Sequence, residues 1–297
     1  MSGFLDALAG ARPLLLDGGL GSMLIARGLG GGEAPERWVL ERGEEVAAVH
    51  RAYVEAGADA VQTATFGAHP ARLARAGLEG RAGEVARAAV ALARAAGAPF
   101  VIGDLGPSGE YLPPVGRADA GELALGFERL AAALAAAGVD ALHVETMSDR
   151  REAALALAAA LRAAPGVPVL VSLTFERRPR GFFTVMGDPL VASLAELAAA
   201  GAAAVGANCT LASSDMLELA RAARAALATP LVVQPNAGQP ILEAGVTRYA
   251  QAPEAFAADL AAIAALGVEA VGGCCGTDPD FIAALRRRLR APAGGPR

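Results

Sequence analysis

Residues 137–146 read AGVDALHVET, a glycine at the end of a helix-like stretch followed directly by a short apolar run. The same arrangement occurs in AGADAV (56–61), AGAAAV (200–205) and LGVEAV (266–271). The glycine suits the left-handed conformation that often closes a helix, and the apolar run suits a buried strand. Each segment therefore predicts a passage from a helix into a strand of a parallel sheet.

Eight apolar runs that end in glycine, proline or polar residues extend this pattern along the chain. They are Leu14–Asp17, Ala60–Phe66, Phe100–Leu105, Ala141–Thr146, Val169–Phe175, Ala204–Cys209, Leu231–Asn236 and Ala270–Cys275. Stretches with helical spacing, such as Gly121–Ala137 and Asp188–Ala200, lie between them. Eight such units predict an α/β protein with a single (β/α)8 TIM barrel, and an open doubly wound sheet is the alternative.

The barrel is expected to account for nearly the whole chain. We predict that residues 1–291 form it and that residues 292–297 are a disordered tail. Residues 106–117 and 177–188 are predicted as long loops after the third and fifth strands. In such a barrel, the residues where strands end and loops begin form the active site.

Composition and charge exclude several partners and mechanisms. The chain has 297 residues, 54% hydrophobic and 4% aromatic, with a formal net charge of −5. A mildly acidic protein does not attract nucleic acid or an anionic membrane, and no stretch is apolar enough to span a membrane. All 26 basic residues are arginines, so a Schiff-base lysine and a P-loop lysine are both absent. The sparse cysteines and the lack of a signal-peptide pattern predict a cytoplasmic protein.

The three cysteines stand at the ends of two predicted strands. Cys209 ends the sixth strand, and Cys274 and Cys275 end the eighth. Both strands belong to the even-numbered set, whose inward side chains share layers in a barrel, so the sulfurs can converge. Zinc favours thiolates in a tetrahedral arrangement, and three protein ligands leave a fourth position open. The cysteines therefore suggest a catalytic zinc site.

The adjacency of Cys274 and Cys275 argues against this interpretation, because successive residues of a regular strand point to opposite faces. The glycines around them, Gly272, Gly273 and Gly276, permit a bend that would bring both sulfurs to one side. The alternatives are three small buried apolar side chains or a strained bond between the adjacent pair. From the residues alone, these alternatives and the metal site are equally favoured.

Other polar residues at predicted strand ends are candidates for binding. They are Asp17, Thr65, Asp104, Glu145, Thr174, Asn208 and Asn236. The segment DGGLGS (17–22) does not match the dinucleotide-binding pattern GxGxxG, because Leu24 stands at its last glycine. The segment is either a turn that binds a carboxylate or a barrel turn that merely requires glycine. Glu145 suits a substrate ammonium, a helix start or a buried ion pair. The three histidines, His50, His69 and His143, lack ligand spacing and are interpreted as structural.

Six motifs make the chain resemble the homocysteine S-methyltransferase family over nearly its whole length. They are LLLDGGLGS (14–22), TATF (63–66), GDLGPSGEYLPPVG (103–116), GANC (206–209), QPNAGQPILE (234–243) and GGCCGTDPDFI (272–282). Within the family, the chain is most similar to the homocysteine-binding module of cobalamin-dependent methionine synthase. It departs from that pattern at Ala64, where TNTF is usual, which weakens the choice of subfamily.

The resemblance implies a (β/α)8 barrel in which Cys209, Cys274 and Cys275 bind Zn2+. It implies that Asp17 and Glu145 bind the ammonium of homocysteine and that the turn at Gly18 and Gly19 binds its carboxylate. Further site candidates are Thr65, Asn208 and Asn236.

The implied reaction is attack of a zinc-activated homocysteine thiolate on an activated methyl group, which makes methionine. We expect the donor to be methylcobalamin on a separate corrinoid protein. The alternatives are a small donor (S-methylmethionine, S-adenosylmethionine or betaine), a non-catalytic homocysteine-binding subunit, and a metal-free barrel lyase or aldolase.

Overall fold

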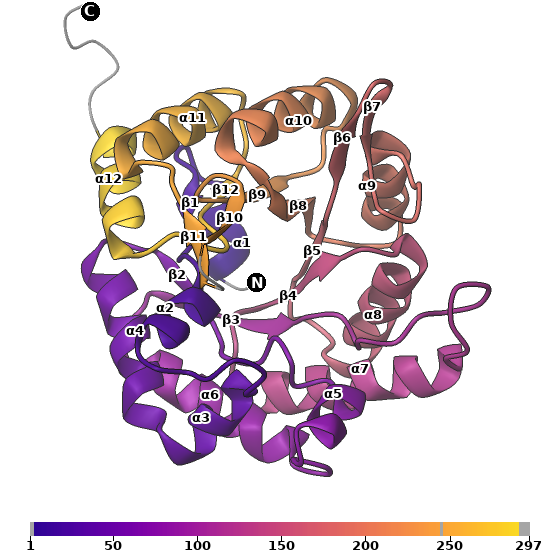
Figure 1. Cartoon of the computed structure of the whole chain (residues 1–297). Helices are drawn as coiled ribbons and strands as arrows, with labels where there is room; N and C mark the ends of the chain where they lie inside the picture. The colour runs from indigo at the N-terminus through magenta and orange to yellow at the C-terminus, as the bar shows by residue number, and fades with distance from the viewer. Residues whose placement is uncertain (1–2, 244–245, 291–297) are drawn as a thin grey trace, which may run out of the picture.

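Eight parallel strands form a barrel that is surrounded by helices (Figure 1). The computed structural model describes residues 3–243 and 246–290. The barrel strands are β1 (Leu14–Leu15), β2 (Ala60–Gln62), β3 (Phe100–Leu105), β4 (Ala141–Met147), β5 (Val169–Leu173), β8 (Ala204–Ala212), β9 (Leu231–Asn236) and β12 (Ala270–Val271). Hydrogen bonds order them β1-β12-β9-β8-β5-β4-β3-β2, and a parallel bridge between Leu16 and Ala60 completes the circle. The predicted (β/α)8 barrel is confirmed, and an open doubly wound sheet is excluded.

Helices follow the strands and form the outer ring. The main ones are α4 (Gly43–Glu55), α6 (Ala82–Ala95), α7 (Ala120–Ala136), α8 (Arg150–Ala163), α9 (Leu190–Ala199), α10 (Ser213–Ala226), α11 (Pro253–Ala265) and α12 (Pro279–Arg290). Four shorter helices are α1 (Gly3–Leu8), α2 (Leu20–Ala26), α3 (Pro35–Glu41) and α5 (Pro70–Arg75). The helices expected over 121–137 and 188–200 correspond to α7 and α9.

Two predictions about the connections need comment. The loop predicted over 177–188 is partly a hairpin of β6 (Glu176–Arg178) and β7 (Gly181–Phe183), whose paired backbones satisfy each other's hydrogen bonds. A second hairpin, β10 (Pro240–Glu243) and β11 (Val246–Tyr249), follows β9. The tail predicted for residues 292–297 lies outside the described residues, and the assignment of residues 1–291 to one domain stays a prediction.

The barrel interior is filled from the amino-terminal ends of its strands. Helix α1 lies against this end, where the ring of Phe4 meets that of Phe100 edge to face at 5.5 Å. A buried cluster continues inward through one or two residues of most strands, including Leu16, Ile102 and Leu170. Because this end is packed with apolar side chains, the opposite end is the one that holds polar groups.

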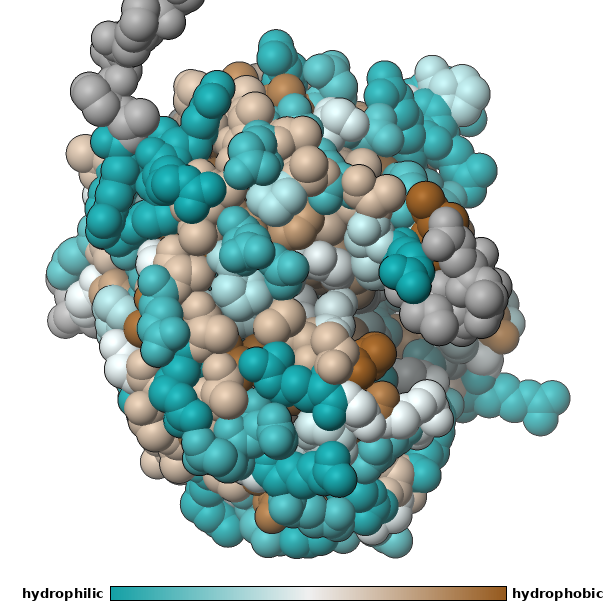
Figure 2. Space-filling model, turned by 60° about the vertical axis from the view of Figure 1, so that its left-hand side comes forward, coloured by the Kyte–Doolittle hydropathy of each residue, from teal (hydrophilic) through white to brown (hydrophobic). Residues whose placement is uncertain are grey.

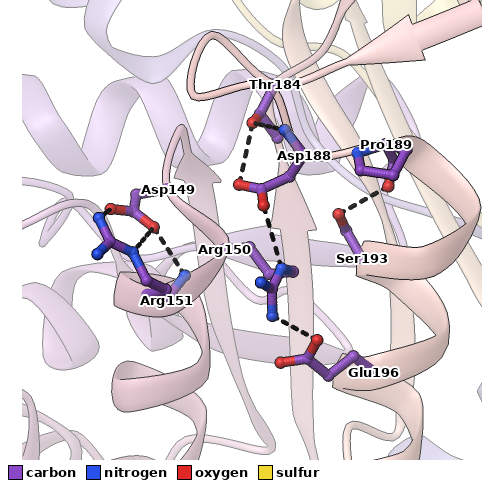
Figure 3. A network of polar contacts seen from close by, with 8 residues as sticks. All are labelled: Asp149, Arg150, Arg151, Thr184, Asp188, Pro189, Ser193 and Glu196. Carbon is purple, nitrogen blue, oxygen red and sulfur yellow. Dashed lines mark hydrogen bonds and ion pairs between the residues drawn. The ribbon is translucent and has the colours of Figure 1, made fainter.

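Several loops at the carboxyl ends are fixed to the helical ring by polar contacts. Figure 3 shows Arg150, at the start of α8, between Asp188 and Glu196. Asp188 in turn bonds the hydroxyl of Thr184, just after β7. Asp149 caps α8 by accepting from the N–H of Arg151, so Asp149, and not Glu145, is the acid at the start of this helix.

On the face in Figure 2, strongly hydrophobic residues form only small separated patches among hydrophilic ones. None of the described helices combines the length and the apolar character needed to cross a membrane.

The close approach of β8 to β9 at Gly206 gives a test of the barrel. A Cβ atom at this position would lie 1.7 Å from the carbonyl oxygen of Val232. We therefore expect Gly206→Ala to lower the free energy of unfolding by about 3 kcal/mol or more, since the strands must separate. Urea unfolding measures this change.

Gly83→Ala is the matched control, because Gly83 lies in α6 and its added Cβ would make only an ordinary contact, 3.5 Å from Arg87. This variant should be neutral or slightly stabilising. Equal stability of the two variants would contradict the close packing of β8 on β9.

Candidate metal centre and adjoining pocket

Three sulfur atoms lie together at the carboxyl end of the barrel. The Sγ atoms of Cys209, Cys274 and Cys275 are all within 4.8 Å of one another. Those of Cys209 and Cys275 are 3.8 Å apart. All three cysteines are free and partly buried. The convergence expected from the sequence is present in the structure.

The backbone leaves regular strand geometry at both places. Cys209 lies in the irregular end of β8 and has a φ of 60°, a left-handed value that is costly for a residue with a side chain. The prediction that Cys274 and Cys275 end a strand is wrong, because β12 ends at Val271 and both cysteines lie in the turn that follows. This turn removes the objection that adjacent strand residues face opposite sides.

Backbone contacts hold the cysteine turn against neighbouring strands. The N–H of Cys274 donates to the carbonyl of Pro235 at 2.9 Å, and the N–H of Cys275 donates to the side-chain oxygen of Asn236 at 3.1 Å. Gly276 has a φ of 79°, and a Cβ there would lie 2.2 Å from the ring of Tyr249. The turn therefore requires glycine at this position.

The sulfur geometry suits a zinc ion. Two thiolates bound to one tetrahedral zinc at about 2.3 Å lie roughly 3.8 Å apart, which matches the separation of Cys209 and Cys275. Hydrogen bonds from Cys274 and Cys275 lower the pKa of Cys209 to about 3. Hydrogen bonding to Cys209 raises the pKa of Cys275 to about 12. The cluster therefore favours one thiolate at Cys209 and disfavours a second at Cys275, unless a cation compensates the charge.

A cavity of about 280 Å³ adjoins the sulfurs. It is lined by residues near the carboxyl ends of β2, β3, β4, β8 and β9 and by the segments that follow β1, β2 and β12. Four acidic side chains line it, namely Asp17, Glu36, Asp104 and Glu145, each at most 8% exposed. No Arg or His is among its lining residues in the described part of the chain.

Gln62 connects the two acids for which the resemblance implies ammonium binding. Its side-chain N–H donates to Oε1 of Glu145 at 3.0 Å, and its backbone N–H donates to Oδ2 of Asp17 at 2.9 Å. The side-chain oxygen of Gln62 accepts from the side-chain amide of Gln234 at 2.9 Å. Sequence reasoning missed both glutamines because they lie within the predicted strands. Their polarity inside otherwise apolar runs is the signal that would have found them.

Asn208 lies behind the cavity and joins it to the sulfurs. Its amide donates to the carboxylate of Glu145, to the hydroxyl of Thr146 at 2.7 Å and towards Sγ of Cys274 at 3.9 Å. The N–H of Thr146, whose φ is 57°, donates back to the Asn208 oxygen at 2.8 Å. Asn208 is fully buried and does not line the cavity, so it orients Glu145 rather than facing a ligand directly.

The other predicted site residues either line the cavity or support residues that do. Gly18 and Gly19 line the cavity, but the N–H of Gly19 already donates to the carbonyl and hydroxyl oxygens of Thr277. Thr65 does not line it and instead donates to the carbonyl of Asp104 at 2.7 Å. Asn236 supports the cysteine turn.

The histidines and Thr174 lie away from the cavity lining. His143 bonds the hydroxyl of Ser172 at 2.8 Å, and His69 caps α5. His50 is fully buried in α4. Thr174 bonds the carbonyl of Met147. These positions agree with the structural roles expected for the three histidines.

Burial dominates the acid–base properties of the cavity. It raises the pKa of Asp17 and of Asp104 well above the usual range for aspartate. Burial also raises the pKa of Glu145 to about 7, against the opposing effect of its hydrogen bonds. The carboxyl groups of Asp104 and Glu145 lie within hydrogen-bonding reach of each other. Burial therefore favours the protonated form of each of these acids more than water does.

A family model described as homocysteine S-methyltransferase matches residues 14–289. The match covers all the barrel strands and every residue of the sulfur cluster. The chain therefore belongs to the homocysteine S-methyltransferase family, and the resemblance seen in its motifs is confirmed.

Relatives of two sizes are similar to the chain. It is 32% identical over 299 residues to methionine synthase of Mycobacterium tuberculosis, a match that covers 94% of this chain and 24% of that protein. It is also 32% identical over 301 residues to homocysteine S-methyltransferase of Escherichia coli, covering 93% and 94% of the two chains. The chain thus spans about a quarter of the methionine synthase.

A crystal structure supports the likeness. The metallated form of the homocysteine methyltransferase MmuM from Escherichia coli superposes with a TM-score of 0.80 at 29% identity, covering 95% of this chain and 98% of that one. The apo form of MmuM gives a TM-score of 0.74.

The raised pKa of Glu145 predicts a pH dependence of stability in the zinc-free protein. Since the folded state binds this proton more tightly than the unfolded state, stability falls as pH rises from the unfolded pKa, near 4.5, to about 7. The loss attributable to Glu145 is at most about 3 kcal/mol. Urea unfolding at a series of pH values measures it.

Glu145→Gln removes the titrating group while keeping its shape. The variant should therefore lose part of this slope. An unchanged slope would show that Glu145 ionises in the folded protein as it does in the unfolded chain.

Proposed function

We propose that this protein is a zinc-dependent homocysteine S-methyltransferase that makes methionine. The observation that carries the proposal is the juxtaposition of three converging free thiols with a cavity of buried acids, which no basic side chain of the described residues lines. Such a site suits an amino thiol, since the sulfur cluster accounts for the thiol and the acids account for the ammonium. Membership of the family agrees with this substrate.

Cys209, Cys274 and Cys275 would hold the metal. Zinc bound by three thiolates would leave one coordination position for a substrate thiol and would favour its deprotonated form at neutral pH. The thiolate is the nucleophilic form of the thiol. The free state of all three cysteines fits a reducing compartment, and we propose the cytoplasm.

The remaining residues bind and orient the amino acid. We propose that Asp17 and Glu145 accept hydrogen bonds from the substrate ammonium, because both line the cavity and both are buried. Asn208 and Gln62 hold the Glu145 carboxylate in place. With Gly19 engaged by Thr277, the backbone N–H of Gly18 is the donor we propose for the substrate carboxylate. Fixed in this way, the substrate sulfur attacks the methyl carbon of the donor, whose leaving group departs with the bonding electrons.

We propose methylcobalamin on a separate corrinoid protein as the donor. The support is the similarity to a methionine synthase in which this chain spans about a quarter of the length, so that about three quarters of that protein lies outside the match. A small sulfonium or ammonium donor is the second candidate, favoured by the Escherichia coli relative that matches this chain end to end.

Removal of one sulfur tests the zinc site. Cys275→Ala should reduce bound zinc from about one ion per chain to near zero. It should also lower methyl transfer to homocysteine more than about 100-fold, because removing a metal ligand weakens activity more than removing a residue that only supports a ligand. Zinc is measured by elemental analysis and methionine by chromatography. The control is Thr174→Val, a buried strand-end change away from the cavity lining. Full activity of zinc-free Cys275→Ala would contradict the proposal.

A donor screen decides between the two donor classes and the non-catalytic alternative. Methylcobalamin, S-methylmethionine, S-adenosylmethionine and betaine are supplied separately with homocysteine. We expect turnover with methylcobalamin. Turnover that is complete with a small donor alone would contradict the corrinoid partner. Tight homocysteine binding without turnover from any donor would indicate a binding subunit.

A further inference from the structure

Asp104 is a third carboxylate beside the two acids proposed to bind the ammonium. It lies near the end of β3, lines the cavity and is 4% exposed. Its Oδ1 atom accepts no hydrogen bond from any residue in the described ranges 3–243 and 246–290. The carboxyl group reaches Glu145, but a buried oxygen without a partner of its own is costly unless a ligand supplies one.

The backbone of Asp104 is held firmly by the preceding strand. Its N–H donates to the hydroxyl of Thr63 at 3.0 Å, and its carbonyl accepts from the hydroxyl of Thr65 at 2.7 Å. The two hydroxyls also bond each other at 2.7 Å. These contacts fix the backbone of Asp104, and none of them uses its carboxylate.

Of the neighbouring acids, Glu145 is the more fully occupied. The two oxygens of Glu145 accept from Gln62 and Asn208, and one oxygen of Asp17 accepts from the N–H of Gln62. The other oxygen of Asp17, like Oδ1 of Asp104, has no partner among the described residues. These unoccupied groups are acceptors, so they match a ligand that carries several N–H donors and a positive charge.

No basic side chain of the described chain lines the cavity to neutralise these acids. The positive charge must therefore come from what binds there. A primary ammonium offers three N–H donors, whereas a quaternary ammonium offers none. These acids therefore distinguish a ligand with a primary amine from a ligand whose amine is methylated or missing.

We propose that Asp104 is a specificity-determining residue that accepts a hydrogen bond from the primary ammonium of the amino thiol substrate. This inference rests on the proposed function. Asp104 selects substrates by their amino group and leaves the metal site and the methyl donor unaffected. Its contribution is expressed mainly in KM rather than in kcat, because the bond to the ammonium is the same before and during methyl transfer.

The test compares homocysteine with 4-mercaptobutanoate, which is homocysteine without its amino group. The measured quantity is the ratio of kcat/KM for the two thiols, with the donor found active in the screen. Asp104→Asn keeps the side-chain shape but removes its charge, and we expect it to lower this ratio about 10- to 100-fold, mostly through KM for homocysteine.

Glu152→Gln is the matched control. Glu152 is a buried acid that does not line the cavity and accepts hydrogen bonds from the N–H and the hydroxyl of Ser108 at 2.8 and 2.6 Å. The control should leave the ratio unchanged. Bound zinc and thermal unfolding are recorded for both variants, and Asp104→Ser is used if Asp104→Asn does not fold.

Equal losses for the two thiols in both Asp104 variants would overturn the proposal, because a purely structural residue does not recognise the amino group. A crystal structure of the wild-type protein with homocysteine gives a second test that needs no variant. The ammonium nitrogen should lie within about 3.2 Å of a carboxylate oxygen of Asp104. A nitrogen bound by Asp17 and Glu145 alone would contradict it. Absence of wild-type turnover with any donor would instead count against the proposed function.

Discussion

The site depends on the seam where the first strand of the barrel pairs with the last. Only two residues of each strand take part, with Leu14 opposite Ala270 and Leu15 opposite Val271. Beyond this seam, the N–H of Gly273 donates to the carbonyl of Asp17 at 2.9 Å. A Cβ atom at Gly19 would lie 2.6 Å from the carbonyl oxygen of Cys274. The closure of the barrel therefore brings the acid of the first loop beside the sulfurs of the last.

The pocket concentrates negative charge where folding alone would not favour it. Buried acids and thiols without a basic partner destabilise the empty protein, and left-handed backbone at Cys209 and Thr146 adds strain. In the proposed function, a metal ion at the sulfurs and an ammonium at the acids would offset the cost of burying these groups.

Ala64, where the chain departs from the motif of its methionine-synthase resemblance, lines the cavity. Its flanking residues Thr63 and Thr65 both contact the backbone of Asp104. Identity to the two curated relatives is the same, so sequence similarity does not distinguish the donor classes.

The sequence by itself determined the barrel, because the helix–glycine–strand repeat is local and follows from backbone preferences and burial. It also made the three cysteines candidates for a metal site, since thiols near the ends of two predicted strands are chemically distinctive. Only the tertiary structure decided that Cys274 and Cys275 lie in a turn, that Asn208 supports Glu145, and that Gln62, Gln234 and Asp104 belong to the pocket. Those facts depend on which residues of separate strands face one another, and the register of a closed barrel sets this rather than any local pattern.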